Sequence, residues 1–139
     1  MAQAKENLAQ TLEQQRARHA WKCVQEIDKR EDRDKKRYRT LALKAPVLVL
    51  TNGLGQTAAF LHDGNEKNTV EERLYQHLSS WLLERVGGAQ AQDDLLETIT
   101  QRWTSAQYRR ATEEALAFLT WLKRFAEAVL PEPEGGETP

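Results

Sequence analysis

The segment PVLVLTNGLGQTAAFL, from Pro46 to Leu61, is the part of the sequence that says most about the fold. Its first apolar run, residues 47–50, has the composition of a β-strand, but its neighbours show helical spacing and no other run of similar character could pair with it. We therefore expect a short buried helix that begins at Pro46, because a proline in the first turn lacks only an N–H that would be unpaired there. Asn52 and Gly53 tolerate positive φ and are predicted to end this helix.

The two glycines of this segment form a tight link between apolar runs. Gly53 and Gly55 lie two residues apart, and Gln56 and Thr57 start a second short helix that is predicted to run to residue 61. Unpaired N–H groups at a helix start, beside glycines that allow close approach, are typical of an anion site. A helix–helix corner, where glycine permits a sharp chain reversal, explains the pattern equally well. Both interpretations stay open, and a rigid corner can also present an interaction surface.

On both sides of this link, apolar residues recur at helical spacing. The further predicted helices are one from about residue 4 to about residue 31, one from a Thr69–Glu72 capping box to Gly87, one behind an Asp94–Glu97 capping box, and one from Ser105 to the residues before Pro131. The predicted fold is therefore all-α: a compact bundle of six or seven helices in a single domain, residues 1–130. Residues 131–139, PEPEGGETP, have nothing to bury and are predicted to be a disordered acidic tail.

Composition excludes several classes of protein. The chain has 139 residues and one cysteine, Cys23, so an intrachain disulfide and a cysteine-based metal cluster are both excluded. The longest apolar run, residues 45–50, is too short to cross a bilayer, and the polar N-terminus is unlike a signal peptide. We expect a cytoplasmic protein with no membrane contact.

The sequence also lacks the motifs of common enzyme classes, including HExxH, GxSxG, GxxxxGK[ST] and CxxC. Cys23 lies beside Val24 in the first predicted helix and is interpreted as a small buried thiol. His19 and His77 have no second ligand three or four residues away. His62, at the mouth of a polar loop, is the one histidine retained as a candidate. We predict no catalytic residue, no metal site and no cofactor.

Charge is distributed unevenly along the chain. Residues 13–44 carry eleven Lys/Arg and six Asp/Glu, a net charge of +5, while the whole chain carries −1 and the remaining residues therefore −6. Such asymmetry indicates a polyanionic partner on one face.

Residues 52–61 resemble the signature of the small helical subunit of the type III-B (Cmr) CRISPR effector complex. The matching signature residues, which we take as candidate subunit contacts, are Asn52, Gly53, Leu54, Gly55 and Gln56. The first predicted helix, with Arg16, Ala17, Ala20, Trp21 and Val24, is similar to the family's opening helix. The resemblance covers residues 13–61 well and the later helices in pattern. Where the family often has Leu-Pro before the apolar run, this chain has Lys44-Ala45-Pro46.

The resemblance implies a non-catalytic structural subunit of an antiviral ribonucleoprotein. Several copies would stack as a minor filament beside the subunits that hold the guide RNA, would reach toward the large subunit, and would help line the channel where target RNA pairs with the guide. Because base pairing reads the sequence, such a protein needs only to grip phosphates and A-form shape.

A Lys/Arg-rich face suits that role. The predicted RNA-contact residues are Arg16, Arg18, Lys22, Lys29, Lys35, Lys36, Arg37 and Arg39. The first three are the most available cations, because the only acids near them in sequence are Glu13 and Glu26. An internal ion pair of Arg16 stays open, since the family signature includes this residue. The others alternate with acids, so a solvated face is the competing interpretation.

Three other functions compete with this interpretation. A generic helical module for protein–protein interaction, without nucleic-acid contact, is the main alternative. A helix-turn-helix DNA binder could use the Gly53–Gly55 link as its turn, but the helix after Gln56 carries no base-reading side chain. An enzyme acting around His62 would need a nucleophile–base pair that the sequence does not indicate.

Overall fold

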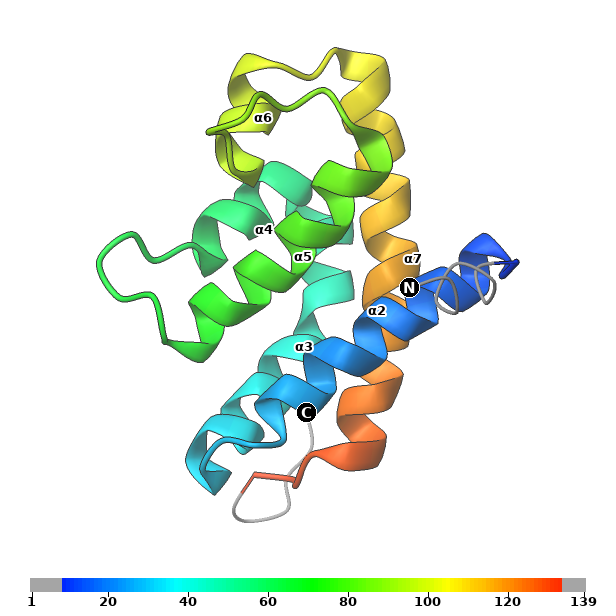
Figure 1. Ribbon diagram of the computed structural model, residues 1–139. Helices are drawn as coiled ribbons and strands as arrows, with labels where there is room; N and C mark the ends of the chain where they lie inside the picture. The colour runs from blue at the N-terminus through cyan, green and yellow to red at the C-terminus, as the bar shows by residue number, and fades with distance from the viewer. Residues whose placement is uncertain (1–8, 134–139) are drawn as a thin grey trace.

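The computed structural model describes residues 9–133 (Figure 1). Its helices are α2 (Leu12–Ile27), α3 (Asp32–Asn52), α4 (Leu54–Leu61), α5 (Val70–Val86), α6 (Leu95–Gln101) and α7 (Ser105–Val129). The described residues contain no strand, so the predicted all-α fold is confirmed. Residues 4–8 of the first predicted helix and residues 134–139 of the predicted tail lie outside the described part. Within the described part this helix is shorter than predicted, because it begins at Leu12, after the Thr11 cap, and ends at Ile27. Among the described helices, none combines the length and apolar character that a membrane span requires.

The longest helix, α7, organises the bundle. It packs chiefly against α2 and α3 and also contacts α5, as Figure 1 shows where α2 crosses in front of α7. Its apolar stripe supplies Phe118, Leu119 and Leu122, all fully buried, because residues three and four apart lie on one side of a helix. Val24 and Ile27 of α2 complete this part of the core. One continuous core therefore holds α2 in a fixed orientation.

Helix α3 continues through Pro46, so the predicted helix start at this residue is wrong. An interior proline removes one backbone hydrogen bond and costs about 3 kcal/mol. Ala42 and Ala45 before the proline and Val49 after it are all buried on one side of α3, and this shared packing holds the two halves in line. Residues 47–50 are helical as predicted, but they are not a buried segment, because Leu50 is 69% exposed.

The corner between α3 and α4 depends on its two glycines. Gly53 has a φ of +94°, a conformation that side chains with a Cβ rarely adopt. The N–H of Gly55 donates to the hydroxyl of Tyr108 on α7, at 2.9 Å, and a Cβ at position 55 would lie 3.3 Å from that oxygen. The corner is thereby fixed to α7, which agrees with the corner interpretation of the glycine link.

Capping explains where the other helices begin. The Thr69 hydroxyl accepts from the N–H of Glu72 as predicted. The reciprocal half of the capping box does not form, because the buried Glu72 carboxylate instead accepts from the N–H of Asp63 at 2.7 Å and contacts His62. Helix α7 begins at Ser105 as predicted, and the preceding Thr104 is its N-cap, with a complete capping box to Gln107. Glu72 thus fastens the loop that connects α4 to α5.

Candidate nucleic-acid interface

Helix α2 and the turn that follows it carry three exposed cations. Arg18, Lys22 and Lys29 are exposed, and none of them forms an ion pair within the described residues. On a helix, Arg18 and Lys22 lie about 40° apart around the axis and about 6 Å apart along it. The buried Val24 and Ile27 lie on the opposite side. Lys29 follows in the turn after the helix end. We call these three residues the α2 cation row.

Three acidic side chains close to the cation row in sequence bond to residues outside the row. Glu13 accepts from the indole N–H of Trp121 at 3.1 Å, and Asp28 lies 3.4 Å from the ammonium of Lys35. Glu26, one turn beyond Lys22, accepts both a two-point contact from Arg73 and a bond from His77. These three carboxylates therefore have partners outside the row, while the exposed Glu31 lines a surface pocket together with Lys29.

The contact of Glu26 belongs to a partly buried polar network. Nε2 of His77 lies 3.0 Å from Glu26, and Nδ1 lies 2.8 Å from the hydroxyl of the fully buried Tyr38. Because a carboxylate only accepts, Nε2 of His77 donates to Glu26. The hydrogen bond from His77, with help from Arg73, outweighs burial and lowers the pKa of Glu26 to about 2. Glu26 is thus held ionised and bonded to two residues of α5.

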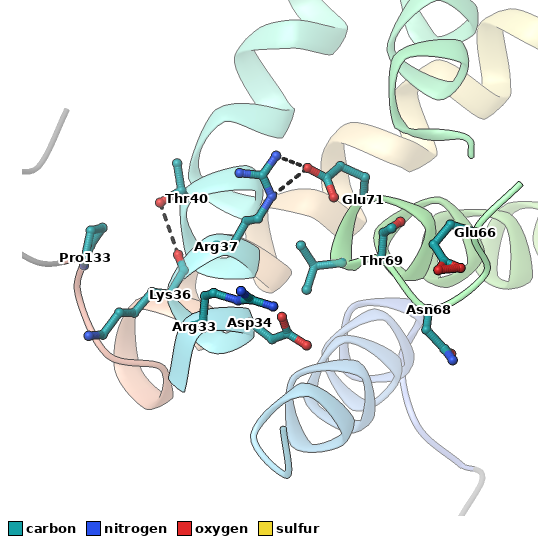
Figure 2. Close-up of a pocket in the computed structure, with 11 residues that line it drawn as sticks. Arg33, Asp34, Lys36, Arg37, Thr40, Glu66, Asn68, Thr69, Glu71 and Pro133 are labelled. Carbon is teal, nitrogen blue, oxygen red and sulfur yellow. Dashed lines mark hydrogen bonds and ion pairs between the residues drawn. The ribbon is translucent and has the colours of Figure 1, made fainter. Parts of the chain in front are cut away.

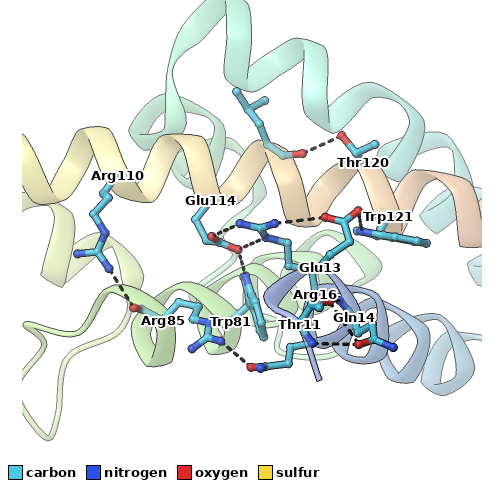
Figure 3. A network of polar contacts seen from close by, with 12 residues as sticks. Thr11, Glu13, Gln14, Arg16, Trp81, Arg85, Arg110, Glu114, Thr120 and Trp121 are labelled. Atoms are coloured by element: carbon cyan, nitrogen blue, oxygen red, sulfur yellow. Dashed lines mark hydrogen bonds and ion pairs between the residues drawn. The ribbon is translucent and has the colours of Figure 1, made fainter. Parts of the chain in front are cut away.

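Arg16 is paired inside the protein (Figure 3). Its guanidinium donates to both carboxylate oxygens of Glu114 on α7, at 2.7 and 2.9 Å, and the Glu114 carboxylate also accepts from Trp81 at 2.8 Å. Burial opposes ionisation of Glu114, but the bonds from Arg16 and Trp81 outweigh it and lower the pKa of this carboxyl. The expectation that Arg16 is among the most available cations is therefore wrong, because a partner 98 residues away satisfies it.

The cations of α3 are also largely engaged. Lys35 lies near the carboxylate of Asp28, and Arg37 donates to Glu71 of α5. Arg39 is only 8% exposed, and its nearest carboxylate is that of Glu132, at 3.8 Å. The sequence predicted a high density of positive charge in this segment. The structure shows that Lys35, Arg37 and Arg39 each lie near a carboxylate from outside α3.

A pocket of about 650 Å³ lies between α3 and the start of α5 (Figure 2). Its walls include three cations and three acids, which are Arg33, Lys36, Arg37, Asp34, Glu66 and Glu71. Opposite charges are present in equal number, so the pocket has no net attraction for an anion. The α2 cation row, in contrast, contains no carboxylate.

The predicted signature residues divide into two groups. Gly53, Leu54 and Gly55 build the corner: Leu54 is fully buried, and the N–H of Gly55 that an anion would need already bonds to Tyr108. Asn52 and Gln56 are exposed and line a small groove of about 200 Å³ with Leu48, Thr57 and Phe60. Only the two amide side chains are therefore placed to contact a partner directly.

Sequence reasoning missed the exposure of Val47, Leu50 and Phe60, which are 57%, 69% and 63% exposed. A signal was present, because Lys44 is the only charged residue between positions 40 and 61 in a chain with 29% charged residues. A helix buries only one side, so a helical segment with many large apolar residues and almost no charge must leave some of these residues exposed.

Cys23 and His62, the two residues considered for catalysis, both lie in structural surroundings: Cys23 is buried, and His62 contacts Glu72. Burial raises the pKa of the Cys23 thiol to about 12, so its nucleophilic thiolate form is strongly disfavoured. His62 lies against the buried Glu72, which at the same time holds the backbone of Asp63. Within residues 9–133, no cluster of three or more His, Cys, Asp or Glu side chains is arranged to hold a metal ion.

Comparison with known proteins identifies the family. The model of the family described as CRISPR-associated protein (Cas_Cmr5) matches residues 12–129. The CRISPR system Cmr subunit Cmr5 of Thermus thermophilus is 37% identical over 118 residues, which are 84% of this chain and 93% of that protein. The crystal structure of a CRISPR-associated Cmr5 family protein from the same organism aligns with a TM-score of 0.69 and 34% identity, over 88% of this chain and all of that one. The chain therefore belongs to the Cmr5 family, the small helical subunits of the type III-B Cmr CRISPR complex.

Proposed function

We propose that this chain is a non-catalytic subunit that stacks as a minor filament within the Cmr ribonucleoprotein. In this role it helps hold target RNA along the guide RNA during antiviral defence. Its partners would be the guide-RNA backbone subunit, the large subunit and further copies of itself. The observation that carries the RNA contact is the α2 cation row, with three exposed cations and no carboxylate among them.

The row suits a backbone contact for a physical reason. Contacts to phosphates supply affinity without reading sequence, which suits a complex in which base pairing reads the target. A cation that is already ion-paired must break that pair before it binds a phosphate, whereas Arg18, Lys22 and Lys29 have no such pair among residues 9–133. Of the other predicted RNA contacts, Arg16 and Arg39 are the least accessible.

The test is target-RNA retention by the reconstituted complex. We would replace Arg18, Lys22 and Lys29 together by Gln and measure the dissociation constant for RNA complementary to the guide across a salt series. Removing one phosphate contact lowers the magnitude of the log–log salt slope by about 0.7 to 0.9, so the slope should flatten by roughly 2 to 3 for each copy that touches the RNA.

A matched variant separates local contact from overall charge. Arg33→Gln, Lys67→Gln and Arg109→Gln together remove the same charge from exposed positions outside the row. This control should leave the salt slope unchanged. If the two triple variants behave alike, or if neither alters RNA retention, a module without nucleic-acid contact explains the protein better.

The non-catalytic assignment has its own measurement. The purified chain, incubated with labelled single-stranded RNA with and without divalent cations, should leave the RNA intact. Cleavage that disappears in the His62→Ala variant would overturn this part of the proposal, because His62 is the one histidine with a partly exposed ring beside a carboxylate.

A further inference from the structure

Trp21 on α2 differs from the other three tryptophans of the chain. Its side chain is 42% exposed, whereas Trp81 and Trp103 are buried. The indole N–H groups of the other three tryptophans each donate to an acceptor within the bundle. The N–H of Trp21 makes no hydrogen bond with any residue in the range 9–133. A tryptophan inside a protein usually pairs this group, so the exposed indole of Trp21 is available to a ligand.

A contact with α7 fixes the orientation of the Trp21 ring. The ring centroids of Trp21 and Phe125 lie 5.0 Å apart, and the two planes meet at 80°, an edge-to-face arrangement. Phe125 is in turn tilted against Trp121, with 5.5 Å between the centroids. An edge-to-face contact covers at most one face of the indole, so Phe125 leaves the other face uncovered for parallel stacking. Because the ring is already held, a ligand that stacks on it costs little side-chain entropy.

Trp21 lies between the buried side of α2 and the α2 cation row. Successive residues of a helix are 100° apart around its axis, which places Arg18 about 60° and Lys22 about 100° from Trp21. The buried Val24 lies about 60° away in the other direction. Along the axis, Arg18 is about 4.5 Å and Lys22 about 1.5 Å from Trp21. The indole is therefore flanked by two exposed cations on the side that faces away from the core.

The charges around Trp21 favour a nucleic acid over a protein. None of the residues three or four positions from Trp21 is acidic; they are Ala17, Arg18, Val24 and Gln25. The centre of a protein interface is depleted of charged residues, so a protein seated on Trp21 would have to desolvate Arg18 and Lys22. A single RNA strand carries both aromatic rings and negative charge, and proteins that hold such strands combine cations with stacking aromatic side chains.

We propose that Trp21 stacks on an unpaired base of the target RNA that the α2 cation row holds. This inference rests on the proposed RNA contact and adds a base contact to it. Inside a duplex the neighbouring bases cover both faces of each base, so the indole can stack only on an unpaired or terminal base. Every base has a π-face, so this contact adds affinity without sequence preference, which suits a complex in which the guide reads the sequence.

Photo-crosslinking in the assembled complex tests the contact directly. Target RNAs that each carry one 5-iodouridine, at successive positions, are bound to a complex that contains the unaltered full-length chain and are then irradiated. Iodouracil couples to aromatic side chains that stack on it, so we expect a crosslink to Trp21 from at least one position. Crosslinks to other residues alone, or no crosslink at all, would overturn the proposal.

Variants of Trp21 measure the affinity that stacking supplies. Trp21→Leu keeps an apolar side chain but removes the ring, and it should raise the dissociation constant for target RNA about 5- to 100-fold. The target should pair with only part of the guide, so that base pairing does not mask the loss. Trp21→Phe keeps a ring and should recover most of the affinity. Phe60→Leu, which removes a 63% exposed ring from α4 outside the cation row, should change nothing. Equal affinity of the Trp21→Leu and unaltered chains would contradict the stacking.

An abasic nucleotide in the target separates stacking from a loss of structure. It is placed at the position that crosslinks to Trp21. If ring and base touch each other, Trp21→Leu should weaken binding of the intact target but not of the abasic target. A loss of the same size with both targets would mean that the substitution acts through the fold, and this result would overturn the proposal.

Hydroxyl-radical footprinting identifies any other occupant of the ring. In the complex without target RNA, Trp21 should be oxidised readily, and bound target should protect it. Protection of Trp21 before target is added would show that another subunit or the guide covers the ring, and the proposal would then be wrong.

The RNA proposal and this inference fail separately. Trp21 is uncharged, so Trp21→Leu should leave the log–log salt slope unchanged, whereas the triple variant of the cation row should flatten it. A flattened slope in the triple variant, together with no effect of Trp21→Leu, would overturn only the stacking. A Trp21 crosslink that persists while the triple variant keeps the full slope would overturn only the phosphate contact.

Discussion

The ionised Glu26 makes a quantitative prediction about stability and pH. Its carboxylate has an ordinary pKa of 4.5 and a pKa of about 2 in the folded chain, because His77 and Arg73 donate to it. That difference corresponds to roughly 3.4 kcal/mol at full strength. The side chain is 41% exposed, so solvent screening reduces the value, and we expect about 1 to 2 kcal/mol of stabilisation at pH 7.

The sign follows from the lowered pKa. A carboxyl that ionises more readily when folded contributes its full stabilisation above pH 4.5, and the contribution is lost as the pH falls from 4.5 toward 2. The Glu26→Gln variant, which cannot ionise, should therefore be less stable than the parent at pH 7. The gap should close on acidification, because the parent then loses the same charge.

Urea unfolding followed by circular dichroism, at pH 7, 5, 4 and 3, measures this gap directly. Glu31→Gln is a suitable control, since Glu31 is exposed and makes no side-chain capping bond, and its effect should stay within about 0.5 kcal/mol at every pH. A gap between parent and Glu26→Gln that stays constant from pH 7 to pH 3 would contradict this account of Glu26. So would a variant that is as stable as the parent at pH 7.

Two further substitutions test the corner and the Arg16 contact. Gly53→Ala places a Cβ on a residue with a φ of +94° and should lower the free energy of unfolding in urea by about 1 to 3 kcal/mol. The control Gly64→Ala, whose Cβ would make only an ordinary contact with His62, should leave this free energy nearly unchanged. Equal effects of the two substitutions would show that a side chain at position 53 does not strain the corner. Glu114→Gln leaves the partly buried Arg16 with only the longer contact to Glu13 and should cost about 2 to 4 kcal/mol by the same assay, and a change below about 0.5 kcal/mol would mean that the Arg16–Glu114 pair does not stabilise the bundle.

Local sequence signals predicted those helix features that depend only on neighbouring residues. The cap at Thr69, the end of α3 at Gly53 and the long apolar stripe of α7 all follow from residues close in sequence, and the structure confirms each. Pro46 shows the limit of such signals. Its local rule favours a helix start, but burial of Val49 and its neighbours against other helices outweighs the missing hydrogen bond.

The signature of the corner shows the same division. Its residues sufficed to indicate the family, and the comparisons confirm that membership. The sequence could not separate the residues that build the corner from those that face outward. That separation depends on Tyr108, which is 53 residues beyond Gly55 and forms no part of the motif itself.

Spacing, caps and one contiguous motif were thus enough to indicate that the chain is helical, where α5, α6 and α7 begin, and to which family the chain belongs. Each of these properties depends on residues close together in the chain. Which cations remain available is visible only in the folded bundle. Arg16 and Arg18 are nearly equivalent in sequence, yet only Arg16 meets a carboxylate from α7. Ion pairing depends on distances of a few ångströms between side chains far apart in the chain, and only folding sets those distances.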